Sequence, residues 1–212
     1  VMYGRHVHVI KENLEAYLQT EEHMPLGETT AFAEEAASEP EEVQTTSSKE
    51  QDSEKKVKET VIISSPITGN AVELSEVPDE GFAGKMMGDG AAVIPDDEYV
   101  YAPADGTVTF VFPTKHAIGF QTDGGHEMLI HVGIDTVSLS GDSFEAFVHD
   151  GDHVRTGDKL LKADIQEIKD KVPSLASPVL FTDLPDCLEV HILKRGKIRS
   201  GEPFLELHNK EK

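Results

Sequence analysis

The chain has 212 residues, of which 40 are acidic and 19 are basic, and its formal net charge is −21. This acidity argues against nucleic acid and anionic membranes as direct partners, because both attract cationic surfaces, and it favours a small basic protein instead. The single Cys187 excludes an internal disulfide and fits a reducing compartment. We expect no transmembrane helix and no signal peptide, since no apolar run is long enough to be either.

The first 60 residues divide into two parts. Residues 1–20 predict a strand with a turn and then a helix whose apolar face carries Leu14, Tyr17 and Leu18. This piece is too small to fold alone. Residues 21–60 are rich in Glu, Ser, Thr and Lys, which predicts a flexible acidic linker, with a solvated acidic helix at "AEEAASE" as the alternative.

From Val61 to Leu207, short apolar runs alternate with clusters of Gly, Pro and Asp. This spacing is typical of many short strands joined by tight turns, and so predicts an all-β sandwich or barrel. Helix is expected only in "ADIQEIKDKV", which ends at Pro173. We therefore assign residues 61–212 to a single domain.

This domain contains short sequence segments that repeat. "VRTGDKLL" (Val154 to Leu161) matches "IRSGEPFL" (Ile198 to Leu205), and "MMGDGAAV" (Met86 to Val93) is a weaker third copy. Likewise "SPITGNAVEL" resembles "APADGTVTFV". We infer an internal pseudo-repeat, in which glycine permits each turn.

Two of the ten histidines stand out. His131 lies in the apolar stretch "EMLIHVGIDTV" and His116 in "FPTKHAIGF"; if "AIGFQT" and "EMLIHV" pair across the "DGGH" turn, the two become neighbours. Treated as strand residues, Thr114 shares a face with His116, and Gly133 and Asp135 share one with His131. Thr114 is therefore expected to bond the His116 ring, and the Gly133 carbonyl one ring nitrogen of His131. Paired imidazoles bind a metal, shuttle a proton or carry a phosphoryl group.

At "TKHAIGF…LIHVGIDTV" the sequence resembles the glucose-type IIA domain of the bacterial sugar phosphotransferase system. The stretches "SPITGNAVELSEVPDEGFAGKMMGDGAAVIP" and "FVHDGDHVRTGDKLLKADIQEI" resemble it as well, so the likeness covers Val61 to Leu207. It implies an all-β sandwich with barrel character, a duplicated hybrid motif and minor helix. It also implies a cytoplasmic phosphohistidine carrier that needs no cofactor and no metal.

The resemblance assigns a role to each site residue. His131 would accept the phosphoryl group from phospho-HPr and pass it to a cysteine of a IIB domain, while His116 stabilises the group and Thr114 orients His116. The residues that would contact the partner are Asp79, Phe82, Gly133 and Asp135. Residues 1–20 resemble the end of a IIB domain, which implies a IIC–IIB–IIA fusion that reaches the membrane only through IIC. Nucleic acid is not an expected partner.

Two alternatives from other functional classes remain open. The first is a zinc-dependent β-sandwich hydrolase that uses the histidine cluster, in which His126 lies five residues before His131. The second is a non-enzymatic regulatory module, since the "GDKLL" and "ADGTV" turns resemble those of lipoyl-type folds. Metal analysis tests the first, and incubation with phosphorylated HPr tests the second.

Overall fold

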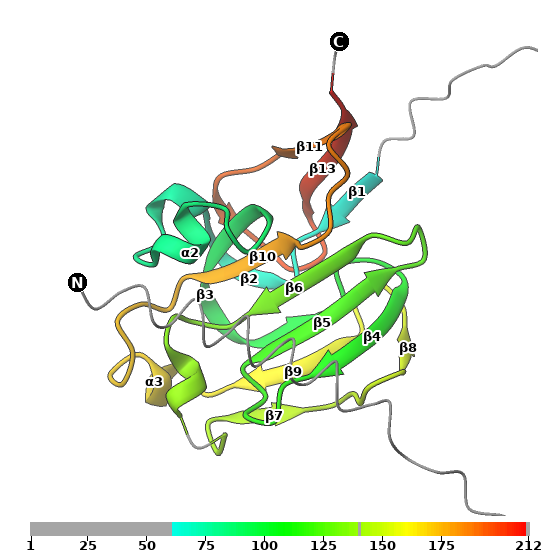
Figure 1. Ribbon diagram of the computed structural model, residues 1–212. Coiled ribbons are helices and arrows are strands. Elements are labelled where there is room, and N and C mark those ends of the chain that lie inside the picture. The colour runs from blue at the N-terminus through cyan, green and yellow to red at the C-terminus, as the bar shows by residue number, and fades with distance from the viewer. Residues whose placement is uncertain (1–60, 140, 211–212) are drawn as a thin grey trace, which may run out of the picture. The chain divides into compact units, whose positions relative to one another are not determined.

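The structure, a computed structural model, describes residues 61–139 and 141–210 and is almost entirely β (Figure 1). Its strands are β1 (Val61–Ser64), β2 (Ile67–Glu73), β3 (Asp89–Tyr101), β4 (Gly106–Val111), β5 (Ala117–Thr122), β6 (Glu127–His131), β7 (Phe144–Ala146), β8 (His153–Val154), β9 (Lys159–Ala163), β10 (Ser177–Phe181), β11 (Leu188–Ile192), β12 (Gly196–Ile198) and β13 (Pro203–Asn209). The helical elements are η2 (Leu74–Glu76), α2 (Glu80–Ala83), η3 (Thr136–Ser138) and α3 (Ile165–Ile168). In these residues no helix is long and apolar enough to cross a membrane. The predictions for residues 1–20 and 21–60 lie outside the described residues.

The strands form two antiparallel sheets. The larger one has the order β12-β2-β3-β10-β6-β5-β4-β8, with β9 joining β7 to β3, and the smaller one has the order β1-β13-β11. Figure 1 shows the larger sheet curling, with the three-stranded sheet beyond its β2–β3 end. The predicted all-β class with barrel character is confirmed.

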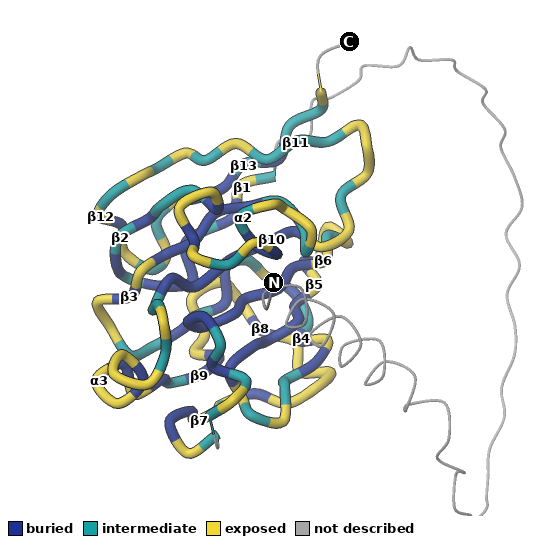
Figure 2. The backbone as a smooth tube through the Cα atoms, turned by 60° about the vertical axis from the view of Figure 1, so that its left-hand side comes forward, coloured by how far each residue is buried: buried dark blue, intermediate teal, exposed yellow. Residues whose placement is uncertain are grey.

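The core lies between the curled strands, as the dark tube of Figure 2 shows. Strand β4 alternates buried and less buried residues, which is the pattern of a sheet with one face towards the core. Central strand β10 is buried at all five positions because both of its faces are covered: Val179 and Phe181 pack in the main core, and Leu180 packs in a second cluster with Phe82. The hairpin of β5 and β6 has the predicted pairing, with Ile118 opposite Ile130 and Phe120 opposite Met128.

The helix prediction was partly right. Helix α3 falls within "ADIQEIKDKV" but ends at Ile168, well before Pro173, with the Asp164 side chain accepting from the Glu167 N–H at its start. Helix α2 was missed, because "EGFA" contains a glycine and is only one turn long. Its start is marked by Asp79, a residue type that favours the N-cap position.

The main pseudo-repeat is present as matching turns. Gly157 (φ 89°) donates its N–H to the Ala102 carbonyl at 2.9 Å, and Gly201 (φ 84°) donates to the Ser65 carbonyl at 2.9 Å. The third copy is not the same turn, since Gly88 has φ 135° and its N–H donates to a carbonyl only three residues earlier.

The acid of each repeat closes its own turn. Asp158 accepts the Arg155 N–H at 2.8 Å, and Glu202 accepts the Arg199 N–H at 3.0 Å. The acid therefore follows the glycine in both copies because it satisfies a backbone donor that the turn leaves unpaired.

Candidate active site

The two singled-out histidines are neighbours at one end of the β5–β6 hairpin. Ala117 pairs with His131, and the Val132 N–H donates to the His116 carbonyl at 2.8 Å. The two ring centroids are 4.8 Å apart with the planes inclined at 72°. Each residue is only 2% exposed. The backbone pairing of the hairpin thus fixes both rings at one point.

One nitrogen of His131 is engaged and the other is not. Its Nδ1 lies 2.8 Å from the Gly133 carbonyl oxygen, as predicted, while Nε2 is buried and makes no hydrogen bond. Burial lowers the pKa of His131 to about 4, although the Gly133 carbonyl and the charges of Asp79 and Asp135 oppose that shift. The ring is therefore neutral near pH 7. Because Nδ1–H donates to the carbonyl, the Nε2 lone pair is unprotonated.

His116 is held in a comparable way by a side chain. Thr114 Oγ1 lies 2.6 Å from His116 Nδ1, as predicted. The geometric reason was wrong, because these residues form a turn rather than a strand, with Lys115 between them at φ 57°. Burial, and then the neighbouring His131, lower the pKa of His116 to about 3. Both rings of the pair are thus neutral near pH 7 in the folded protein.

The segment after His131 is also a turn, so the prediction that Gly133 and Asp135 continue the strand face was wrong. Strand β6 ends at His131, and φ is 71° at Gly133 and 60° at Asp135. A Cβ on Gly133 would lie 2.8 Å from Cγ2 of Thr136. Glycine is required here because the chain must turn back sharply to bring its own carbonyl under the His131 ring.

Helix α2 brings two predicted partner-contact residues to the site. Asp79 is the N-cap, and its Oδ1 accepts the N–H groups of Gly81 at 2.9 Å and Phe82 at 3.1 Å. The Phe82 ring packs against His131 with centroids 5.3 Å apart and is 2% exposed. Met86, just after the helix, is 70% exposed. Phe82 therefore forms one wall of the histidine pair, and Met86 is the apolar side chain that reaches solvent.

Two residues near the site were missed in the sequence. The Phe112 ring packs on His116 with centroids 5.0 Å apart and borders a hollow of about 530 Å³ that Lys115 also lines. Ser177 begins β10 and bonds the Gly133 backbone. Ser177 lies 44 residues from Gly133 in sequence, and no periodicity links the two.

The remaining described histidines lie elsewhere. His126, the extra ligand of the hydrolase alternative, packs on Phe181 at the far end of β6 from His131, with centroids 6.2 Å apart. His149, His153 and His191 are exposed. Within residues 61–139 and 141–210, no group of three His, Cys, Asp or Glu side chains is placed to hold a metal ion. Among the described residues, the histidine pair therefore has no third ligand of these types beside it.

The fold places the chain in a class of all-β IIA proteins. The solved structure of glucose permease IIA from Mycoplasma capricolum matches with a TM-score of 0.66 and 40% identity, over 70% of this chain and 96% of that one. Residues 61–187 match the family described as phosphoenolpyruvate-dependent sugar phosphotransferase system, EIIA 1. The chain therefore belongs to that family.

Curated relatives are of two kinds. The "PTS system glucose-specific EIIA component" of Oceanobacillus iheyensis is 44% identical over 149 residues, which are 70% of this chain and 90% of that protein. The "PTS system glucoside-specific EIICBA component" of Staphylococcus carnosus is 44% identical over 148 residues, again 70% of this chain but only 21% of that protein. The chain thus spans about a fifth of such a fused relative.

Proposed function

We propose that the chain is a phosphohistidine carrier, in which His131 accepts a phosphoryl group from phospho-HPr and passes it to a cysteine of a IIB domain. The observation that carries this proposal is the buried Nε2 of His131, which makes no hydrogen bond while Nδ1 is fixed to the Gly133 carbonyl. A neutral imidazole with one free lone pair is a nucleophile at neutral pH.

The transfer step balances without a cofactor. The Nε2 lone pair forms a bond to phosphorus while the bond from phosphorus to the donor group of HPr breaks, and its electron pair leaves on the donor. The proton on Nδ1 stays in place, because the Gly133 carbonyl accepts its hydrogen bond at 2.8 Å and stabilises the positive charge that the ring gains. Transfer to the IIB thiolate reverses these changes at His131.

His116 takes the opposite tautomer to His131, with its proton on Nε2. When the Thr114 hydroxyl donates to Nδ1 of His116, the ring carries its proton on Nε2, which then donates to an oxygen of the phosphoryl group. Since the ring centroids are 4.8 Å apart and Nδ1 of each ring is already engaged, we infer that both Nε2 atoms can reach one phosphoryl group. His116 therefore stabilises the group in transit without bonding to phosphorus.

The names of the relatives and the acidic residues near the site support two protein partners. Relatives such as the glucosamine-specific EIICBA component of Bacillus subtilis carry, by name, IIC and IIB parts together with IIA. We infer a IIB domain as the acceptor and a place on the cytoplasmic side of a sugar transporter. Asp79 and Asp135, which act electrostatically on His131, suit a basic donor such as HPr.

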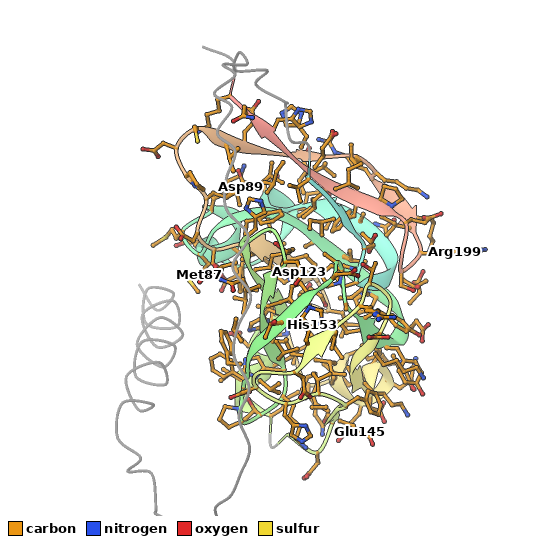
Figure 3. All side chains as sticks on the ribbon, turned by 90° about the vertical axis from the view of Figure 1, so that its right-hand side faces the viewer. Met87, Asp89, Asp123, Glu145, His153 and Arg199 are labelled. Atoms are coloured by element: carbon orange, nitrogen blue, oxygen red, sulfur yellow. The ribbon has the colours of Figure 1, made fainter. Side chains whose placement is uncertain are left out.

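Intact-mass measurement after incubation with phosphorylated HPr tests this proposal. We expect one added phosphate on the full chain and none on the His131→Ala variant. His153→Ala is the matched control, since His153 is an exposed histidine whose Nε2 lies 3.0 Å from Oδ1 of Asp123 (Figure 3). A phosphate retained by His131→Ala would assign the acceptor to another residue.

A further inference from the structure

Ser177 bonds the turn that holds His131. It is the first residue of β10 and is fully buried, at 0% exposure. Its Oγ accepts the Gly133 N–H at 3.1 Å and donates to the Leu175 carbonyl at 2.9 Å. The hydroxyl therefore uses its proton on Leu175 and offers a lone pair to the residue whose carbonyl holds the His131 ring.

The peptide units on both sides of Gly133 are fixed by hydrogen bonds. In the preceding unit, the Val132 carbonyl accepts from Thr136 Oγ1 at 2.8 Å, while Ser177 takes the Gly133 N–H. In the following unit, the Ile134 N–H donates to the Ser174 carbonyl at 2.9 Å. The direction of the Gly133 carbonyl is thus set largely from the segment 174–177, which lies across the turn.

Ser177 matters because Gly133 has no side chain to hold it. Glycine visits many backbone conformations, and at φ 71° its orientation depends on the bonds its peptide groups make. Removing the hydroxyl leaves a buried N–H without a partner, which favours a rotation of the turn that restores a hydrogen bond. That rotation would move the carbonyl away from Nδ1 of His131.

We propose that Ser177 is a positioning residue for phosphoryl transfer: through Gly133 it keeps the proton of His131 on Nδ1 and the Nε2 lone pair free. The effect of Ser177 on phosphoryl transfer rests on the proposed function, whereas its effect on the tautomer of the His131 ring does not. Loss of the bond should increase the population of the tautomer that carries its proton on Nε2, which is not nucleophilic at that nitrogen.

Three variants of the full chain test this role. Ser177→Ala removes the hydroxyl, and Ser177→Cys fills the space with a slightly larger group that is only a weak acceptor. Ser65→Ala is the matched control, because Ser65 is 1% exposed and its Oγ donates to the Ile67 carbonyl at 2.7 Å, away from the histidines. The readouts are the ring ¹⁵N chemical shifts of His131 and the single-turnover rate of phosphorylation against the concentration of phospho-HPr.

We expect both Ser177 variants to shift the His131 ring towards the tautomer with its proton on Nε2. The maximal rate should fall about tenfold, the effect of one buried hydrogen bond. The half-saturating concentration of phospho-HPr should stay the same, since the docking residues are untouched. Ser65→Ala should change neither readout.

Two results would overturn the proposal. An unchanged tautomer population in Ser177→Ala would show that Gly133 needs no help from the hydroxyl. Normal behaviour of Ser177→Cys would show that Ser177 only fills space. By contrast, a shifted tautomer in a chain that is never phosphorylated on His131 would overturn the proposed function and leave the hydrogen-bond role of Ser177 standing.

Discussion

The rings of His116 and His131 meet nearly edge to face, with centroids 4.8 Å apart and planes inclined at 72°. Each is tethered through Nδ1, His116 to the Thr114 hydroxyl and His131 to the Gly133 carbonyl. The tethers differ in kind, because a carbonyl only accepts whereas a hydroxyl also donates. Two rings of the same residue type can therefore hold different tautomers and play different parts.

The unequal tethers predict unequal effects of substitution. His131→Ala should abolish phosphoryl acceptance from HPr, because it removes the nucleophile. His116→Gln should leave acceptance by His131 measurable but slow donation to IIB, since a flexible amide replaces the imidazole N–H that Thr114 holds in position. Separate single-turnover assays of the two half-reactions check this. Acceptance that survives both substitutions would place the acceptor elsewhere.

The ring of His131 should stay neutral well into acid. Burial lowers its pKa from 6.5 to about 4, so the Nε2 lone pair remains available at pH values where a solvated histidine is protonated. We expect NMR titration of the ring to show a midpoint near pH 4 rather than near 6.5. A midpoint at the ordinary value would mean that the ring is solvated and that the free nitrogen is not protected from water.

The same shift predicts that stability depends on pH. The folded-state pKa of His131 lies below the unfolded value of 6.5, so the unfolded chain binds the extra proton first. Its contribution is therefore complete above pH 6.5 and is lost as the pH falls towards 4. The loss should be about 3 kcal/mol. Urea unfolding at pH 7 and 4.5 measures it, and His131→Gln, which does not titrate, should show a smaller drop than the parent chain.

Gly133→Ala should damage the site more than its cost in stability implies. The left-handed conformation at φ 71° costs a residue with a Cβ about 1–2 kcal/mol, and the new atom would meet Thr136 Cγ2 at 2.8 Å. Relief of that contact moves the Gly133 carbonyl, so phosphorylation of His131 should slow.

Gly157→Ala is the control for backbone strain. Gly157 has φ 89°, and a Cβ there meets nothing within 4 Å. Both variants should lower the urea midpoint, but Gly157→Ala should be phosphorylated at the parent rate. Equal phosphorylation rates for the two variants would show that the carbonyl of Gly133 is not needed.

Sequence patterns located the histidine pair because a hairpin between two segments adjacent in sequence brings the two residues together. Residues 117–122 and 127–131 are two apolar runs joined by a short polar turn, and the observed hairpin pairing then makes His116 and His131 neighbours. Thr114 was identified although the strand assumption was wrong, because a turn with Lys115 at φ 57° also brings residues two apart together.

What the patterns missed depends on contacts that are distant in sequence. Ser177 reaches Gly133 only because β10 lies beside β6 in the sheet, and no turn signal gives that strand order. Helix α2 was missed because one helical turn has no periodicity to detect. The resemblance had assigned Asp79 only a contact with the partner, and its second role as the N-cap emerged only from the structure.

Because Asp79 is both a helix cap and a charge near the site, its two effects on the association with HPr must be separated. Asn caps a helix as well as Asp does, so Asp79→Asn should keep α2 while removing one charge. Asn also tolerates the left-handed conformation that Asp135 adopts at φ 60°, so Asp135→Asn removes a second charge at little conformational cost. The two substitutions therefore isolate electrostatics.

Charge attraction should act mainly on the encounter rate, and salt screens it over about 10 Å at 0.1 M. We expect the second-order rate of phosphorylation by HPr to fall with ionic strength in the parent chain. Each substitution should lower that rate at low salt and flatten its salt dependence. Glu189→Gln is the matched control, since it also replaces a carboxylate by an amide of the same shape, and Glu189 is paired with His191 on β11, outside the histidine site. If neither salt nor the two aspartate substitutions change the rate, docking is apolar, and Met86, at 70% exposure, becomes the contact to mutate next.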